Sequence, residues 1–263
     1  MIGAVGEDDF GRVNINRLVR DGVDISGIAI NPDHPTGSAF VRYRIDGSRD
    51  FVYNISTSAA SKFGWTHDVE ALADRSGHLH VMGSSLSMPS AWAVIEKAAK
   101  VVKKRGGSIS LDPNLRKELK YDIETEERFV QLVRMSDLLL PSGEELELAA
   151  GVEGEAAAVA RLFELGPREI VLKRGEEGAT CFLSDGTIEN SSAFQVDELD
   201  PTGAGDCFGG AYVACRRLGM SVESALTYSS AAGARNVAVR GPMEGAGTLA
   251  ELDRFIKTTK RLL

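Results

Sequence analysis

The chemistry available to this sequence is concentrated in one stretch, Asp200–Asp206, which reads Asp-Pro-Thr-Gly-Ala-Gly-Asp. An apolar run that we expect to be helical begins directly after it. Gly203, Ala204 and Gly205 carry little or no side chain. Their backbone N–H groups can therefore converge on an anion at the N-terminus of that helix, where the helix dipole also favours negative charge. Asp206 can then act as a general base that takes a proton from a hydroxyl attacking a phosphoryl group.

This stretch also fits a structural role, and two other classes of phosphate-binding protein are possible in principle. An aspartate that follows a glycine-rich turn is also a common helix N-cap, and a bare Gly-Ala-Gly-Asp fits that role equally well. The rival phosphate motifs, G-x-x-x-x-G-K-[ST] and G-x-G-x-x-G, do not occur in the sequence. Their absence argues against a P-loop enzyme and against a dehydrogenase-like dinucleotide binder.

Over a dozen positions the pattern D-x-T-G-A-G-D-x-F-x-G-[GA] resembles the signature of the PfkB (ribokinase-like) carbohydrate kinases. This resemblance implies that the amides of Gly203–Gly205 form the anion hole and that Asp206 is the base. It also implies that Thr202 contacts the nucleotide and that Asn236 belongs to the wall beside adenine. Asp200 would then lie near a monovalent cation such as K⁺.

Composition places few other limits on function. The chain has 263 residues, of which 43% are hydrophobic and 26% charged, as in ordinary globular proteins with one large α/β domain or two small ones. Its net charge of −8 argues against nucleic acid or an anionic membrane as a partner. Three scattered cysteines and the lack of a signal peptide or a long apolar span suggest a cytoplasmic protein.

Strand and helix patterns alternate through the middle of the chain, which is typical of a parallel sheet with helices on both faces. Polar loops follow the apolar runs that end at Leu111, Leu140 and Leu172, and a strand-like segment, Phe194–Leu199, precedes the signature. Ligands of open α/β sheets bind beyond the carboxyl ends of the strands. We therefore expect these loops to share one cleft in a ribokinase-like α/β fold, mainly parallel, with a small β-lid.

The loop Asp112-Pro-Asn-Leu-Arg places an acid, an amide and a guanidinium close together. Arg116 could brace a phosphate or a sugar oxygen with two hydrogen bonds, and Asn114 could contact the sugar. The same residues would also suit a solvated loop with a local Asp–Arg pair. The phrase D-P-N-x-R resembles a motif that is frequent in sugar-acid and ketohexose kinases of the family.

Two further motifs resemble the nucleotide and metal sites of the family. Ser142 and Glu145 lie where the family carries Asn-x-x-Glu, which implies that Glu145 orders Mg²⁺ through water and that Ser142 replaces Asn; an acidic first helical turn is the alternative. Lys173, Gly175 and Gly178 resemble the nucleotide-contacting [TK]-x-G-x-x-G turn, which could also be a plain strand-to-strand turn.

Residues 38–55 alternate apolar and polar side chains around Asp46-Gly47, which predicts a β-hairpin. By resemblance, residues 36–57 form a lid that closes over the sugar and can pair with the lid of a second subunit in a homodimer. Tyr53 and Asn54 would then bind the sugar. A peripheral hairpin is the alternative.

The chain opens on an apolar segment, Ile2–Gly6, that looks like the end of a buried strand, followed by an amphipathic helix with Phe10, Ile15, Leu18 and Val19 on its apolar face. In the family this phrase follows a first strand and a sugar-binding loop. We therefore expect a single kinase domain over residues 1–263 that lacks roughly the first 35 to 40 residues of a typical member. A truncated, nucleotide-binding homologue without catalysis remains the alternative.

Taken with the resemblance, these residues predict an enzyme that transfers phosphate from ATP, with Mg²⁺, to a hydroxyl of a small sugar. Ser58-Ala-Ala-Ser61 resembles the 2-keto-3-deoxygluconate kinases, but the preceding residues 53–57 contain no cation to meet the carboxylate of a sugar acid. We therefore expect a neutral ketohexose of the fructose or tagatose kind. Arg42, Arg44 and Arg49 keep the sugar acid as the alternative.

Overall fold

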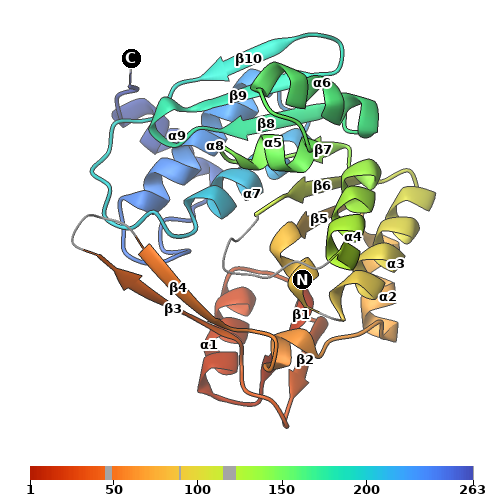
Figure 1. The fold of residues 1–263 in the computed structure, drawn as a ribbon. Helices are drawn as coiled ribbons and strands as arrows, with labels where there is room; N and C mark the ends of the chain where they lie inside the picture. Colours follow the sequence, from red (N-terminus) through yellow and green to blue (C-terminus); the bar gives the residue numbers. More distant parts are fainter. Residues whose placement is uncertain (45–48, 89, 115–122, 263) are drawn as a thin grey trace. The chain divides into compact units, whose positions relative to one another are not determined.

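The computed structural model describes residues 1–44, 49–88, 90–114 and 123–262, and these group into two compact units (Figure 1). Unit 1 comprises Met1–Ile109 and Leu115–Leu132, and unit 2 comprises Ser110–Asn114 and Val133–Leu263. None of the helices in these described ranges is both long and apolar enough to cross a bilayer.

Unit 1 begins with a parallel pair of strands and a short antiparallel hairpin, followed by helices around a further strand. Its elements are β1 (Ile2–Gly6), α1 (Asp9–Arg20), β2 (Gly27–Asn31), β3 (Ser38–Tyr43), β4 (Arg49–Asn54), α2 (His67–Arg75), β5 (His78–Met82), α3 (Ala91–Lys104) and α4 (Ile123–Met135), the last of which ends in unit 2.

Helix α1 forms where it was predicted, but its apolar face was only partly predicted. Ile15 and Leu18 are half-buried, whereas Phe10 is 75% and Val19 55% exposed. The reason is Gly11, where a Cβ would lie 2.1 Å from the carbonyl oxygen of Gly6. The helix therefore packs backbone to backbone through Gly11, and residues 11, 15 and 18 share the inner face.

One carboxylate ties three segments of unit 1 together. Asp8 Oδ1 accepts hydrogen bonds from the Gly11 amide at 2.8 Å, which caps α1, and from the Thr36 hydroxyl at 2.7 Å. Asp8 Oδ2 accepts a bond from the Thr36 amide at 2.7 Å, and Thr36 Oγ1 accepts one from the Gly6 amide at 2.9 Å. These bonds, those from Thr36 first, lower the pKa of Asp8 below its ordinary value.

The predicted hairpin is present as β3 and β4, and its register assigns the side chains to faces. Tyr53 lies opposite Ala39, and Asn54 lies opposite Ser38. Because successive side chains on a strand point to opposite faces, Tyr53 and Asn54 cannot both meet a ligand on one face. Asn54 shares its face with Phe40 and Val52, each 62% exposed.

Unit 2 is built on a sheet in which β6 to β10 pair in the order β10-β9-β8-β7-β6. The pairs β6–β7 and β7–β8 are parallel, whereas β8–β9 and β9–β10 are antiparallel. The elements are β6 (Ser108–Asp112, which enters from unit 1), β7 (Leu138–Leu139), α5 (Glu145–Ala150), α6 (Glu155–Leu165), β8 (Glu169–Lys173), β9 (Ala179–Leu183), β10 (Ile188–Ser191), α7 (Ala204–Arg217), α8 (Val222–Val237) and α9 (Leu249–Thr258).

The strand-like segment before the signature is not a strand, which corrects the expectation for Phe194–Leu199. Its β-type pairing, in the part of the chain that the structure describes, consists of one isolated antiparallel bridge between Phe194 and Arg261. Phe194 instead packs in a small core with Ala231 and Leu252 from helices α8 and α9. Strand β10, which was not predicted, supplies the sheet edge in its place.

Both faces of the unit 2 sheet are covered. Val171 of β8 packs with Phe208 of α7 and Leu226 of α8 in the main cluster on one face. Its neighbours Ile170 and Leu172 are equally buried although they point the other way. The α/β fold with a mainly parallel core and helices over both faces is therefore confirmed.

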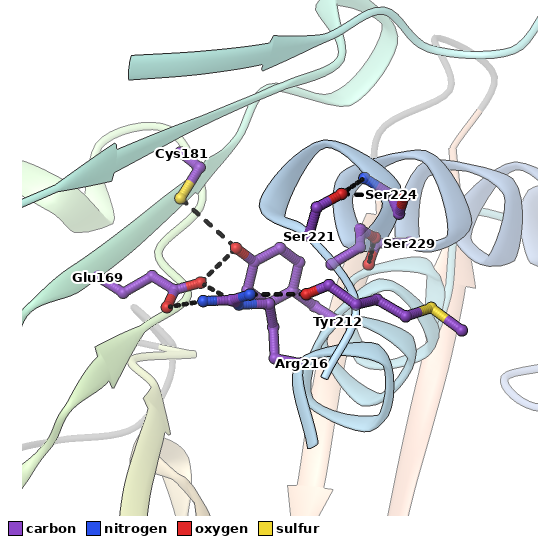
Figure 2. Close-up of polar contacts among 9 residues, drawn as sticks. Glu169, Cys181, Tyr212, Arg216, Ser221, Ser224 and Ser229 are labelled. Carbon is purple, nitrogen blue, oxygen red and sulfur yellow. Dashed lines mark hydrogen bonds and ion pairs between the residues drawn. The ribbon is translucent and has the colours of Figure 1, made fainter. Parts of the chain in front are cut away.

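A partly buried polar cluster connects the second half of α7 to the amino-terminal end of β8 (Figure 2). The hydroxyl of the fully buried Tyr212 donates to Glu169. Arg216 donates to both oxygens of Glu169, at 3.0 and 3.3 Å. Cys181 Sγ lies 3.4 Å from the Tyr212 hydroxyl, and burial raises the pKa of Cys181 to about 12.

Replacing Asp8 with Asn should lower the midpoint of urea unfolding, because an amide NH₂ would face one of the three donors that the carboxylate now satisfies. Since folding lowers the pKa of Asp8, its contribution to stability is complete above the ordinary value of 3.8 and is lost as the pH falls through the lowered one. The difference in urea midpoint between the original protein and Asp8→Asn should therefore become smaller in acid. Asp9→Asn, which removes only the exposed pair with Arg12, is the matched control and should unfold like the original protein. Equal midpoints for both variants would contradict this role of Asp8.

Candidate functional site

The carboxyl ends of three parallel strands in unit 2 meet at one edge of the sheet. Strand β6 ends at Asp112 and β8 ends at Lys173, with β7 between them. The pairing of β7 and β8 continues past the strands, since the Lys173 amide donates to the carbonyl of Pro141 at 2.9 Å and Ser142 forms a parallel bridge with Lys173. The ends of these strands therefore lie together, as predicted, and the loop after β6 lies outside the described residues from position 115 to 122.

A buried ion pair joins the ends of β6 and β8, the two strands that flank β7. Lys173 Nζ lies 2.6 Å from Asp112 Oδ2, and the two residues are only 9% and 3% exposed. Asp112 Oδ1 accepts a hydrogen bond at 3.2 Å from the amide of Asn114, which adopts a left-handed conformation with φ of 40°. Arg116, the cation predicted for this loop, lies outside the described residues.

Helix α7 begins directly over this ion pair. A Cβ built on Gly205 would lie 3.5 Å from Lys173 Nζ, and one on Gly209 would lie 3.9 Å from Asp112 Oδ2. Gly203 is the N-cap, with φ of 78°, and Asp206 is exposed on the first turn. The structure therefore brings the N-terminus of a helix, one ammonium and one exposed carboxylate to the same place.

Buried side chains satisfy the backbone of the turn that leads into α7. The carboxylate of Asp200 accepts from the amides of Thr202 and Gly241, each at 3.0 Å. Asn236, which is fully buried, donates to the carbonyl of Thr202 at 2.7 Å and accepts from the amide of Gly245 at 3.2 Å. These contacts make Asp200 and Asn236 supports of the turn. The predicted cation role of Asp200 and the predicted nucleotide contacts of Thr202 and Asn236 stay predictions.

Glu145 turns back onto its own loop. Its Oε2 accepts a hydrogen bond at 2.8 Å from the amide of the exposed Ser142, which satisfies one free N–H at the start of α5. This fits the interpretation as an acidic first turn, and the magnesium role stays a prediction. Within the described ranges, no three His, Cys, Asp or Glu residues gather as a metal cluster would require.

The glycines after Lys173 have different surroundings. The turn from Gly175 to Glu177 joins β8 to β9, as predicted for a strand-to-strand connection. A Cβ on Gly178 would lie 2.0 Å from the carbonyl oxygen of Ser191, so this position requires glycine for packing. Gly175 has nothing within 4 Å of its would-be Cβ, and its φ of 59° favours glycine; the predicted nucleotide contact stays a prediction.

The sequence interpretation missed Asp112 as a member of the site. Its partner Lys173 is 61 residues away, and local spacing suggested Arg116 instead. A signal was present, because Asp112 and Lys173 each end an apolar strand and such ends share an edge. Tyr53 and Asn54, the other predicted binding residues, lie on β4 of unit 1.

Comparison with known proteins places this geometry in context. The family model described as pfkB family carbohydrate kinase matches residues 1–248. A 2-dehydro-3-deoxygluconokinase of Thermoproteus tenax is 31% identical over 98% of the chain and 79% of its own length. A fructokinase of Vibrio alginolyticus is 29% identical, covering 97% of the chain and 84% of its own length. The crystal structure of an E. coli protein described as a ribokinase II, in complex with ATP and Mg²⁺, is 42% identical with a TM-score of 0.92 and covers 97% of the chain and 82% of its own.

The two glycines at the start of α7 should respond differently to alanine. Gly203→Ala should lower the free energy of unfolding by more than about 1 kcal/mol, because φ is 78° and the new Cβ would lie 2.0 Å from the Pro242 carbonyl oxygen. Gly205→Ala should be neutral or stabilising by up to about 1 kcal/mol, since its methyl group meets only ordinary contacts and alanine favours helix. Urea unfolding of both variants measures this. Equal destabilisation would show that Gly205, too, is required for packing rather than for ligand access.

Proposed function

Because the chain belongs to the pfkB family of carbohydrate kinases, we propose that ATP with Mg²⁺ is its phosphoryl donor and a neutral ketohexose of the fructose or tagatose kind its acceptor. The coarser activity, transfer of a phosphoryl group to a sugar hydroxyl, follows from the family. The donor, the sugar and the role of each residue are the parts proposed here.

The observation that supports the proposed mechanism is the start of α7 at the carboxyl edge of the sheet. Asp206 is exposed on the first turn, where it can take the proton of the attacking hydroxyl. We assign stabilisation of negative charge on the transferred group to the amides of Gly203, Ala204 and Gly205 together with the helix dipole; the Ala204 amide also donates to the Pro201 carbonyl at 3.3 Å. Arg116, which we expect to assist them, lies outside the described residues.

The proposed donor site uses residues at the same edge. The E. coli relative binds ATP with Mg²⁺, and here we assign Lys173, Gly175 and Thr202 to the triphosphate. Mg²⁺ usually takes one or two carboxylates and fills its remaining positions with water and substrate phosphates. Glu145 fits such a role as a single carboxylate and would contact the ion through water. The metal would offset phosphate charge when bound.

The proposed acceptor is argued from the hairpin. Residues 53–57 contain no cation, and burying a sugar-acid carboxylate without one would cost several kcal/mol. Tyr53 and Asn54 can each serve neutral hydroxyls, from opposite faces of β4. A second candidate, 2-keto-3-deoxygluconate, is favoured by the 31% identical relative and by Arg42, which shares the Asn54 face and is exposed.

Asp206→Asn should lower kcat by at least about 10²-fold while ATP binding stays nearly unchanged, because the amide cannot accept the proton of the attacking hydroxyl. Steady-state kinetics and calorimetric titration with ATP measure the two effects. Asp197→Asn removes the same charge from an exposed position ahead of the turn and is the matched control. Activity within a few-fold of the original protein would rule out Asp206 as the base.

Fructose or tagatose should give a higher kcat/KM than 2-keto-3-deoxygluconate, because the stretch 53–57 cannot pair a carboxylate. The measurement compares kcat/KM for the three sugars at saturating ATP and Mg²⁺. A clear preference for the acid, reduced selectively by Arg42→Ala, would instead support the second candidate. ATP binding without turnover of any sugar would support the non-catalytic alternative.

A further inference from the structure

We propose that Lys173 is a catalytic residue whose ammonium stabilises charge on the phosphoryl group in flight, and that Asp112 is the positioning residue that holds it there. The inference rests on the proposed function, since it assumes that the start of α7 receives the transferred phosphate. It assigns Asp112 a role and gives Lys173 a task beyond holding the nucleotide.

The ion pair with Asp112 fixes the position of the Lys173 ammonium. Strands β6 and β8 place Asp112 and Lys173 at one edge, where their charged atoms lie 2.6 Å apart. The second oxygen of Asp112 accepts the amide of Asn114, so the carboxylate is oriented from both sides. The ammonium is therefore held next to Gly205, 3.5 Å from where its Cβ would be.

Electrostatics explains why such an arrangement suits a transferred phosphate. The N-terminus of α7 carries partial positive charge, so an ammonium beside it is unfavourable unless anions are near. Asp112 supplies one negative charge, and the phosphoryl group at the helix start would supply more. Negative charge spreads over the equatorial oxygens of that group during transfer, and a fixed cation stabilises it without reorganisation.

A purely structural explanation of the pair is weaker on physical grounds. Burying two charges costs desolvation that apolar residues of similar volume would avoid, so a buried ion pair is poor evidence for stability alone. An apolar side chain lies beside the pair, because Leu140 and Asp112 are 3.7 Å and 3.9 Å from the same would-be Cβ of Gly209. Both oxygens of Asp112 are engaged, one by Lys173 and one by the Asn114 amide, which fits a residue that acts through Lys173 rather than on a ligand.

The test compares Lys173→Met, Asp112→Asn and the double variant by kcat, KM for ATP and urea midpoint. Lys173→Met should lower kcat by about 10²-fold or more and also lower the midpoint, because it leaves Asp112 buried and unpaired. Asp112→Asn should lower kcat by about 10-fold through a misplaced ammonium. The double variant leaves no unpaired charge, so its midpoint should recover while kcat stays as low as in Lys173→Met. Lys257→Met, an exposed change on α9, is the control and should leave both unchanged.

Recovery of kcat in the double variant would overturn the inference, because it would show that the pair acts only through stability. A second measurement does not depend on turnover or on the identity of the sugar. With Mg²⁺ present, Lys173→Met should weaken binding of ADP plus aluminium fluoride, which mimics the phosphoryl group in transfer, more than binding of ADP alone. Equal weakening of both would reduce Lys173 to a nucleotide contact. If the original protein turns over no sugar, the proposed function fails, and this binding difference still decides the role of Lys173.

Discussion

The fit of helix α7 along strand β8 is the constraint on which the rest of unit 2 depends. The helix starts over Lys173 at the carboxyl end of β8 and reaches Glu169 at the amino end, so helix and strand run antiparallel. The contacts come from positions 205, 209, 212 and 216, a spacing that lies along one face of a helix. Glycines occupy the site end of this stripe and large polar residues the other end.

The two ends of α7 therefore have different tasks: one end holds the helix on the sheet, and the other end faces the candidate site. At the far end, Tyr212 and Arg216 donate hydrogen bonds to Glu169 in a partly buried cluster (Figure 2). At the near end, Gly205 and Gly209 face the Asp112–Lys173 pair, and a Cβ on either would be in ordinary van der Waals contact with it. A helix that is held firmly at its C-terminal half can present its N-terminus to a ligand without losing its own contacts.

The turn before α7 has no ladder to satisfy its backbone, and side chains perform this task. Asp200 and Asn236 bind the amides and the carbonyl that a regular element would otherwise pair. Unit 1 uses the same device, since the carboxylate of Asp8 joins the end of β1, the start of α1 and the approach to the hairpin. In both units a buried or partly buried side chain sets the course of a loop next to a predicted binding segment.

The sequence alone predicted the family and the order of most elements, because these depend on local properties. A turn rich in glycine and a regular apolar period act within a few residues. The structure makes Gly203, and not Asp206, the N-cap of α7. Only the tertiary structure decided which distant residues meet. The structure pairs Asp112 with Lys173, which is 61 residues away, and packs α1 through Gly11 instead of through Phe10. It also places Tyr53 and Asn54 on opposite faces of β4 and packs Phe194 against helices instead of into a strand. Each of these depends on strand order, register or close backbone contact, and these arise only when segments far apart in the chain pack together.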